Sequence, residues 1–395
     1  MRTMKLSSLG TLRNGMNYDK SAAIKGCKII GVADFGNRVF PDYTALNEID
    51  ASIVTEDDLL KNGDILFVRS NGNKNLVGRS MYIRDIVEPV CYSGFCIAFR
   101  PNTDLVYPEY LFYALRTPFC KKQYSYSQQT NITNISQGVL GAVDVPIPDL
   151  DTQQKLAKIL IELDQKIAIN SQICVKLENM AKLLYDYWFT QFDFPNEDGK
   201  PYRSSGGEMV WNEQLKRKIP KGWTSDKIGN LLAKIPNTTR ILTKDYSNAG
   251  SIPVIDQSAN FIAGYTDDKT ALLSAESGYI VFGDHTRIVK YVRFPFARGA
   301  DGTQILKTNT DHIPDELLYQ IVKSVDLSNY GYARHFKFLK DTLTFVPDKQ
   351  VGQKYAKIVQ GAFEKQSHLI FENIELTKLR DWLLPMLMNG QATVV

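Results

Sequence analysis

Two related stretches of the chain decide the fold: PDLDTQQKLAKI at 148–159 and PDKQVGQKYAKI at 347–358. Self-similarity between distant segments is the signature of a structural repeat. Further related pairs recur in the same order, namely NGDILF (62–67) with SGYIVF (277–282) and PEYLFY (108–113) with PDELLY (314–319). The sequence therefore predicts a two-fold repeat, in which each unit is a globular domain followed by a helix.

The segment from 151 to 194 has the sequence of a long helix. It contains no Pro or Gly and places apolar residues every seven positions, which is typical of helices that pack along one another. The first seam position holds Leu156, Leu163, Asn170, Leu177 and Leu184, and the second holds Leu160, Ile167, Cys174 and Ala181. The second copy keeps Tyr355, Ala362, Leu369, Leu376 and Leu383 at the first position. The matched pair favours mutual packing of the two helices over packing of each helix on its own domain alone.

The ends and the register of the two helices can also be predicted in part. Each helix is expected to start at an Asp that follows a proline, since Asp is a good N-cap. Asn170 interrupts the apolar seam, as polar residues that fix register do. The second helix has Lys365, Glu372 and Pro385 where a regular seam would be apolar, which leaves its length and register open.

The globular segments mix short β-like runs such as 64–68 and 278–282 with helices such as 108–117 and 314–325. A connector rich in Gly, Pro and Ser separates the repeats. The predicted class is α+β, with two α/β domains separated by two long coiled-coil-like helices. The expected boundaries are a first domain at 1–148, a first helix at 149–194, a connector at 195–222, a second domain at 223–347 and a second helix with its tail at 348–395.

Composition narrows the class of protein. A chain of 395 residues, 44% hydrophobic and 23% charged, is ordinary for two or three globular domains. No apolar run is long enough for a membrane span and no signal peptide precedes the first domain, so we expect a cytoplasmic protein with no membrane contact. The five cysteines form no C-x-x-C pair and are expected to be reduced and mostly buried. A net charge of +4 permits nucleic-acid binding where positive charge is clustered.

Polar loops in the first domain have the composition of a DNA-contacting surface. The run RSNGNKN (69–75) follows a predicted strand, and the uncharged run YSYSQQTNITN (124–134) comes later. Arg pairs well with guanine, Asn and Gln with adenine, and Ser and Thr with phosphate. Solvated loops without a ligand are the alternative. The candidate contacts are Arg69, Asn71, Asn73, Lys74, Arg79, Gln128, Thr130, Asn131 and Asn134.

The second domain has polar turns of its own at 254–260 and 283–287, and an aromatic and basic run, YGYARHFKF, at 330–338. Interleaved aromatic and basic residues are common at nucleic-acid surfaces. Phe336 and Phe338 are expected to face the core, which leaves Arg334, His335 and Lys337 to face outward. The candidate contacts are Gln257, Asn260, His285, Arg287, Arg298, Arg334, His335 and Lys337.

No catalytic motif is convincing. The chain has no Walker-type phosphate loop, no G-x-S-x-G elbow and no Pro-Pro dipeptide of the kind that amino-methyltransferases carry. The four histidines are never spaced i, i+4, so we predict no metal site. Pro148-Asp149 followed by Asp164-Gln165-Lys166 fits a loose nuclease pattern, but inside a helix side chains two positions apart diverge by about 200°. We therefore expect the chain to be non-catalytic.

The segments named so far, together with several others, resemble the specificity (S) subunits of type I restriction–modification systems. The resemblance covers essentially the whole chain in the order of that family. Its segments are PIPDLDTQQK (146–155), LDQKI (163–167), YWFTQFD (187–193), GKPY (199–202), IPKGW (219–223), RHFKFLK (334–340) and LLPMLMNG (383–390). The first domain departs from the pattern, because it lacks a counterpart of IPKGW and starts directly at Lys5-Leu6, so its first strand is expected to be trimmed.

The resemblance implies a DNA-sequence reader with two target-recognition domains held apart by two antiparallel helices, each domain reading half of a split site in double-stranded DNA. It further implies that the helices dock modification (methyltransferase) subunits, which bind S-adenosylmethionine and methylate adenine. Restriction subunits, which use ATP and Mg²⁺ for translocation and cleavage, join that core. No cofactor is expected on this chain itself.

The outer face of the first helix is the expected subunit interface. It has polar and charged residues along its length and an aromatic cluster at its end, and aromatics are enriched at interface hot spots. The alternative is that these aromatics are the point where the first helix docks on its own domain. The candidate interface residues are Lys158, Glu162, Lys166, Lys176, Tyr185, Tyr187, Trp188 and Phe189.

Two other classes of function stay open: a metal-dependent nuclease that uses the acid–lysine pattern, and a coiled-coil adaptor that binds only proteins. DNA recognition is preferred, and because the loops of the two domains differ in sequence we predict a bipartite, asymmetric target. A helix of about 36 residues is about 54 Å long, which exceeds one turn of the duplex.

Overall fold

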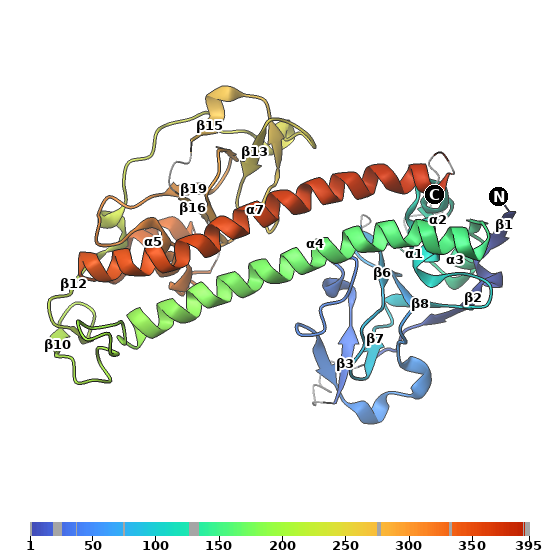
Figure 1. Cartoon of the computed structure of the whole chain (residues 1–395), viewed down its shortest axis with the longest axis horizontal. Helices are drawn as coiled ribbons and strands as arrows, with labels where there is room; N and C mark the ends of the chain where they lie inside the picture. The colour runs from blue at the N-terminus through green and yellow to red at the C-terminus, as the bar shows by residue number, and fades with distance from the viewer. Residues whose placement is uncertain are drawn as a thin grey trace. The chain divides into compact units, whose positions relative to one another are not determined.

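The computed structural model (Figure 1) describes residues 2–18, 26–36, 38–73, 76–125, 134–274, 278–331, 334–389 and 391. The chain divides into two units. Unit 1 consists of Met1–Ile169 with Glu372–Val395, and unit 2 consists of Asn170–Phe371. Each unit therefore contains one α/β domain and a portion of each long helix.

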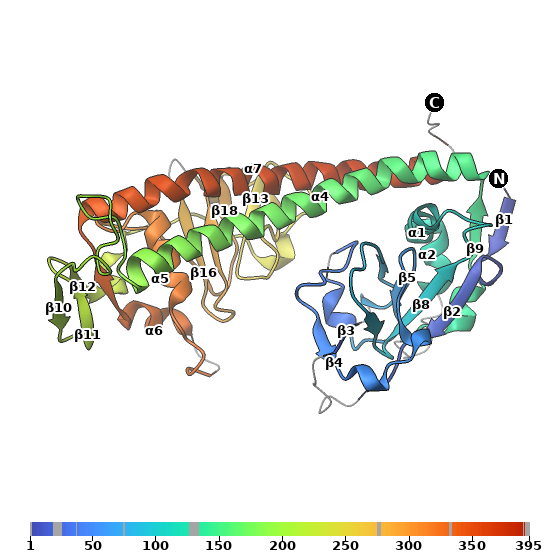
Figure 2. The ribbon, with the colours of Figure 1, turned by 60° about the horizontal axis from the view of Figure 1, so that its bottom comes forward.

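Unit 1 is built on two main sheets (Figure 2). One sheet has the order β2-β8-β5-β6, the other has the order β4-β3-β7 with β3 parallel to β7, and β1 pairs with β9. The elements are β1 (Arg2–Lys5), β2 (Gly10–Asn14), β3 (Cys27–Ile30), β4 (Asn47–Ile49), β5 (Ile65–Val68), β6 (Ser80–Tyr82), β7 (Val90–Tyr92), β8 (Cys96–Pro101), α1 (Pro108–Arg116), α2 (Pro118–Ser125), α3 (Gln137–Gly141) and β9 (Asp144–Ile147).

Unit 2 repeats this plan after a hairpin in the connector. Its sheets have the orders β17-β16-β19 and β14-β13-β18-β15, with β13 parallel to β18, and β12 pairs with β20. The elements are β10 (Met209–Asn212), β11 (Arg217–Pro220), β12 (Thr224–Lys227), β13 (Ile252–Ile255), β14 (Gly264–Thr266), β15 (Leu272–Leu273), β16 (Tyr279–Gly283), β17 (Val289–Val292), β18 (Phe296–Arg298), β19 (Thr303–Leu306), α5 (Asp315–Ser324), α6 (His335–Asp341) and β20 (Leu343–Val346).

The repeat predicted from the sequence is confirmed by the elements. Strands β5 and β16 arise from the NGDILF and SGYIVF segments, and helices α1 and α5 arise from PEYLFY and PDELLY. The expected trimming of the first strand is wrong. Strand β1 has four residues and pairs with β9, as the four-residue β12 pairs with β20. The first domain reaches the same pairing without an IPKGW segment, because an edge strand needs only its backbone to join the ladder.

Both long helices form as predicted: α4 spans Leu150–Tyr185, a π-helical turn continues it to Thr190, and α7 spans Lys349–Met388. Asp149 caps α4, because its Oδ1 accepts a hydrogen bond from the backbone N–H of Thr152 at 2.9 Å. Helix α7 continues through Pro385, and the N–H of Asn389 still reaches the Pro385 carbonyl at 3.0 Å. The missing proline donor is tolerated because Asp381, four residues earlier, is exposed and water can satisfy its carbonyl.

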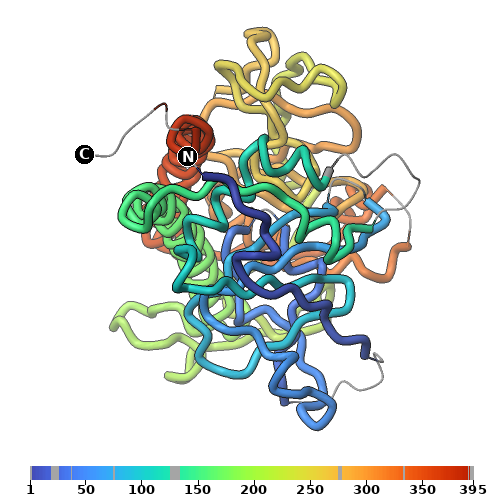
Figure 3. Tube along the Cα trace, turned by 90° about the vertical axis from the view of Figure 1, so that its right-hand side faces the viewer, coloured from blue at the N-terminus to red at the C-terminus, as the bar shows by residue number. Residues whose placement is uncertain are grey.

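Within each unit the two helices pack against each other in opposite directions, and α4 (green) lies beside α7 (red) in Figures 1 and 3. In unit 1, Asp164 bonds to Arg380 and the carbonyl of Ile167 bonds to Asn373. In unit 2, the carbonyls of Cys174 and Ala181 accept hydrogen bonds from Gln366 and Tyr355. The predicted seam is confirmed at Leu156, Leu160, Asn170, Ala181, Tyr355 and Leu369, all of which are buried.

Each unit has a hydrophobic core that joins its domain to its helix segments. The core of unit 1 includes Phe99 and Tyr110 of the domain together with Leu160 of α4 and Leu387 of α7. The core of unit 2 includes Phe282, Trp223 and Tyr355. Burial of this kind contributes about 25 cal/mol per Å² of apolar surface, so each domain and its helix segments are expected to unfold together.

Among the described residues, no helix is both long enough and apolar enough to cross a membrane, and no group of three or more metal-ligating side chains comes together. All five cysteines are free thiols; four are buried and Cys174 is half-buried, as the sequence predicted.

Candidate nucleic-acid interface

The predicted contact residues of unit 1 gather where several loops meet at one end of the sheets. Strand β5 ends there and β8 begins there, since Val68 pairs with Cys96. The N–H of Arg69 donates to the Phe95 carbonyl at 2.8 Å, and the Arg69 carbonyl accepts from the N–H of Ile135 at 2.9 Å. We refer to residues 31–36, 69–73, 76–79, 93–95 and 134–136 as loop cluster 1.

Two arginines hold loop cluster 1 together. The Nη1 group of Arg69 donates to the Gly94 carbonyl at 3.4 Å, and that of Arg79 donates to the Gly36 carbonyl at 2.5 Å. Both side chains are half-buried, so neither guanidinium moves as freely as one at the end of an exposed side chain. Since a guanidinium carries five N–H donors, one bond to the backbone orients it without exhausting its capacity for base or phosphate contacts.

The amide side chains of cluster 1 face outward. Asn71 is half-buried and its Oδ1 accepts from the N–H of Asn73 at 2.7 Å, while Asn73 and Asn134 are exposed. Asn134 also forms a β-bridge with Ser70. The predicted contacts Lys74, Gln128, Thr130 and Asn131 lie outside the described residues.

Sequence reasoning missed Phe95 at the tip of the turn between β7 and β8. Its side chain is 61% exposed, although its carbonyl accepts hydrogen bonds from the N–H groups of both Arg69 and Ser70. An exposed aromatic on a fixed backbone can stack on a base or contact a thymine methyl group. The available signal was the Ser93-Gly94-Phe95 turn between two strand-like runs.

The contact residues predicted for unit 2 also gather at the end of the sheets. Strand β16 ends where β19 begins, since Gly283 pairs with Thr303. Asp284, which is only 4% exposed, joins the loops: its N–H donates to the Gly302 carbonyl at 2.7 Å, and its Oδ1 accepts from the N–H of Phe336 at 2.8 Å. We refer to residues 256–261, 283–288, 299–303 and 334–336 as loop cluster 2.

The two clusters are topologically equivalent. Each consists of the loop after β3 or β13, the loop after β5 or β16, the turn before β8 or β19, and the residues that begin α3 or α6. Related loops such as 69–79 and 284–288 share no sequence similarity. The repeat therefore presents different side chains on one framework.

Three predicted contacts of unit 2 form hydrogen bonds within the protein, and the structure contradicts the expected outward orientation of one of them, His335. His335 is 3% exposed, and its Nδ1 lies 2.9 Å from the Asp284 carbonyl, so it does not face outward. The amide of Gln257 donates to the Asp301 carbonyl at 2.8 Å and accepts from the N–H of His285 at 3.1 Å. The Nε of Arg298 donates to the Thr303 carbonyl at 2.8 Å, and burial lowers the pKa of Arg298 to about 10.

The other predicted contacts of unit 2 are exposed, namely Asn260, His285, Arg287, Arg334 and Lys337. Arg287 has a left-handed backbone conformation (φ +61°), and its Nη1 lies 3.3 Å from the Leu327 carbonyl. Phe336 and Phe338 pack partly against the core as predicted, and Phe338 stacks on Tyr330 with ring centroids 4.1 Å apart.

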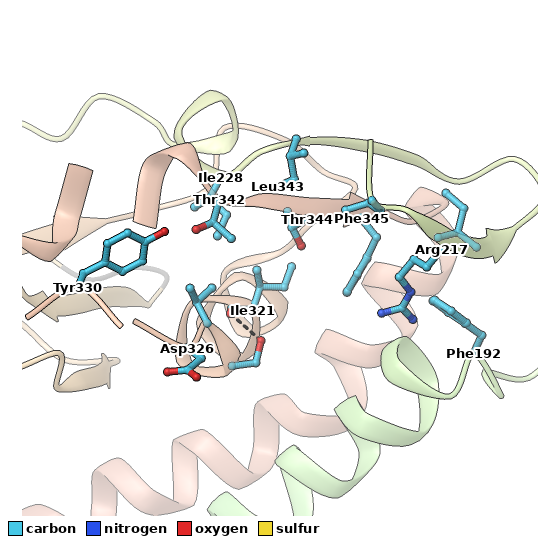
Figure 4. A pocket seen from close by; sticks show the side chains of 14 residues that line it. Phe192, Arg217, Ile228, Ile321, Asp326, Tyr330, Thr342, Leu343, Thr344 and Phe345 are labelled. Atoms are coloured by element: carbon cyan, nitrogen blue, oxygen red, sulfur yellow. Dashed lines mark hydrogen bonds between the residues drawn. The ribbon is translucent and has the colours of Figure 1, made fainter. Parts of the chain in front are cut away.

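A pocket of about 420 Å³ lies elsewhere in unit 2 (Figure 4). Its lining includes Phe345 of β20, Ile321 of α5 and Arg217 of β11, and the guanidinium of Arg217 lies over the ring of Phe192 at 4.6 Å. The lining contains none of the predicted contact residues that the structure describes, so the pocket is separate from loop cluster 2.

The predicted subunit interface is partly wrong. Tyr185, Trp188 and Phe189 are at most 5% exposed and belong to the core of unit 2, where Phe189 stacks on Phe345 with centroids 5.4 Å apart. They dock the end of α4 on the second domain, whereas the alternative interpretation placed them on the helix's own, first domain. Tyr187 stays 37% exposed. The charged candidates Lys158, Glu162, Lys166 and Lys176 are exposed, and Lys166 forms an ion pair with Glu372 at 3.3 Å.

The acid–lysine pattern does not form a nuclease site. Asp164 is buried in α4, where it bonds to Arg380 and Tyr113, whereas Lys166 points to the surface. The two side chains therefore share no metal site, as the helical spacing predicted.

Comparison with known proteins agrees with these observations. The type I restriction modification DNA specificity domain model matches residues 1–179. The chain is 27% identical to the MjaIX specificity subunit of Methanocaldococcus jannaschii (74% of this chain, 70% of that one) and 24% identical to the HindI specificity subunit of Haemophilus influenzae (84% and 87%). The fold resembles the crystal structure of a type I S subunit from M. genitalium, with a TM-score of 0.53, 14% identity and coverage of 98% and 95%.

These findings agree with the two equivalent domains and the paired helices, and they favour DNA specificity over the adaptor and nuclease alternatives. Residues 1–179 match the type I restriction modification DNA specificity domain, and over most of its length the chain is similar to specificity (S) subunits of type I restriction–modification systems.

Proposed function

We propose that loop cluster 1 and loop cluster 2 each contact one half of a bipartite, asymmetric target in double-stranded DNA. The observation that supports this most is the equivalence of the two clusters in topology and their difference in side chains. Cluster 1 offers Arg69, Asn71 and Arg79, whereas cluster 2 offers His285 and Arg287. Different donors and acceptors on one framework favour different base pairs.

The functional domains would follow the boundaries expected from the sequence. Recognition domains occupy 1–148 and 223–347, the helices 149–194 and 348–395 lie after them, and 195–222 is the connector. In support, α4 begins at Leu150 and α7 at Lys349, each directly after the last strand of a domain.

We further propose that α4 and α7 dock two modification subunits and that restriction subunits join the assembly. The support is an apolar stripe on α4 of unit 2. Met180 and Leu183 are spaced i, i+3 on α4 and are 63% and 68% exposed, and Tyr187, in the π-helical turn that follows, is 37% exposed. Exposed apolar stripes mark interaction sites. In this assembly the partners, not this chain, use S-adenosylmethionine, ATP and Mg²⁺.

Competition binding by the reconstituted complex tests whether each loop cluster contacts only its own half of the DNA target. We compare Asn71→Ala and Arg287→Ala with the exposed control Lys61→Ala, using duplexes that carry single substitutions in either half of the target. A lost bidentate base contact costs about 1–3 kcal/mol. Asn71→Ala should therefore weaken discrimination in one half and Arg287→Ala in the other. Loss of discrimination in both halves by either variant would contradict the proposal.

A further inference from the structure

A buried lysine of the neighbouring strand β17 holds one loop of loop cluster 2. Lys290 lies in β17 and is only 5% exposed. Its Nζ donates to the carbonyls of Asp256 at 2.8 Å, Phe261 at 3.3 Å and, by a shorter bond, Asn260. An ammonium group has three N–H donors, so the loop carbonyls use all of them.

Burial of this lysine is energetically costly. Desolvation lowers the pKa of Lys290 to about 8, and the attraction of the Asp256 carboxylate, 4.0 Å away, offsets the desolvation only in part. A buried ammonium persists where hydrogen bonds compensate for its lost hydration. Here that compensation comes from backbone carbonyls of a loop, which are not part of any strand ladder.

The internal repeat shows that the fold does not require a lysine at this position. Leu66 of β5 corresponds to Val281 of β16, since the NGDILF and SGYIVF segments align. Leu66 pairs with Met81, and Val281 pairs with Lys290. The equivalent residue in unit 1 is therefore a methionine, and it is fully buried.

The loop that Lys290 holds is connected to the rest of cluster 2. The side chain of Gln257 in this loop bonds to Asp301 and His285, and the Gln257 carbonyl accepts from Thr286 Oγ1 at 2.8 Å. Gly302 (φ +73°) packs against the Gln257 side chain, and only glycine leaves room for this contact, because a Cβ at position 302 would lie 2.7 Å from Gln257 Nε2. Displacing the loop would therefore displace the 283–288 and 299–303 loops as well.

We propose that Lys290 is a positioning residue for DNA specificity: it holds loop 256–261 in the shape that cluster 2 needs to discriminate bases in its half of the target. This inference rests on the proposed function. In unit 1 the equivalent loop is held differently, by the bond from Arg79 to Gly36, and Met81 packs in the hydrophobic core.

Selection from a randomised duplex library by the reconstituted complex tests this role. The variant is Lys290→Met, which introduces the residue type that unit 1 has at the equivalent Met81. The control is Lys221→Met, which removes a cation of the same unit from an exposed pair with Glu208. Lys290→Met should reduce discrimination about 5- to 100-fold at one or more positions of the cluster 2 half and leave the other half unchanged. Lys290→Gln, whose amide keeps two donors, should fall between wild type and Lys290→Met. Hydrogen exchange should accelerate at 257–261 in Lys290→Met and not in the control.

Several results would overturn the proposal. They are unchanged discrimination in Lys290→Met, equal losses in both halves, or failure of unit 2 to fold in both Lys290→Met and Lys290→Gln, which would make the lysine a requirement of the fold. Arg287→Ala, measured in parallel, separates this outcome from a failure of the proposed function. If Arg287→Ala changes neither half, cluster 2 is not a contact surface at all.

Discussion

The buried ion pair between α4 and α7 in unit 1 gives the most quantitative test of the helix packing. Arg380 Nη1 lies 2.6 Å from Asp164 Oδ1, and the side chains are 14% and 1% exposed. The other carboxylate oxygen accepts from the Tyr113 hydroxyl at 2.6 Å, so Asp164 also ties α1 to the helices. Arg380→Met leaves a buried carboxylate without its cation, and we expect unit 1 to lose stability.

Breaking one partner of a buried pair costs about 3–5 kcal/mol. The positive charge of the nearby Arg116 still attracts the Asp164 carboxylate in the variant. We therefore expect Arg380→Met to reduce the stability of unit 1 by about 3 kcal/mol, the lower end of this range. In a unit of this size each kcal/mol shifts Tm by about 2–4 °C, so the expected loss is about 6–12 °C. Replacing both partners, in Asp164→Leu with Arg380→Met, should recover part of it because the buried carboxylate without its cation is then removed as well.

Differential scanning calorimetry and urea unfolding of the full chain measure these effects. The matched control is Lys166→Met, which removes the exposed partner of Glu372 and should cost less than about 1 kcal/mol. A loss below about 1 kcal/mol for Arg380→Met, or a double variant less stable than either single one, would refute the reasoning.

Three further predictions concern unit 2 and its helices. Trp188→Ala should destabilise unit 2 by about 3–5 kcal/mol in thermal unfolding, because Trp188 belongs to the core; a stable variant that fails to assemble would contradict this. Leu183→Glu should leave Tm within about 1–2 °C but weaken co-purification with modification subunits, since the side chain is 68% exposed; unchanged assembly would count against the docking stripe. Burial raises the pKa of Asp315 to about 6, above its unfolded value. The protonated group therefore favours the folded state below about pH 4, and this contribution is lost as the pH rises to 6. Asp315→Asn should flatten the fall in Tm between about pH 4 and 7, and an unchanged slope would refute the assignment.

The repeat, the helices and most element positions could be predicted from the sequence, because periodicity and self-similarity are local signals. Leu156, Leu160 and Tyr355 are buried where the heptads placed them. The length of α7 could not be predicted, because tolerance of Pro385 depends on whether the unpaired carbonyl can reach water.

The region of the candidate site could be predicted from the sequence, but the roles of its residues could not. The polar composition located both loop clusters, yet it could not separate Arg287, which is exposed, from Gln257 and His335, which bond to neighbouring loops. Buried charges such as Asp164 and Lys290 were missed because their partners come from distant parts of the chain. Aromatic enrichment at 185–189 could not distinguish a core from an interface, since both favour large apolar side chains.

Methylome sequencing of cells that contain the complete system tests the central claim most directly. The wild-type subunit should give methylated adenines in one bipartite, asymmetric motif with unread bases between its halves, and Arg287→Ala should relax one half only. A contiguous palindromic motif, or a variant that changes both halves together, would contradict the account.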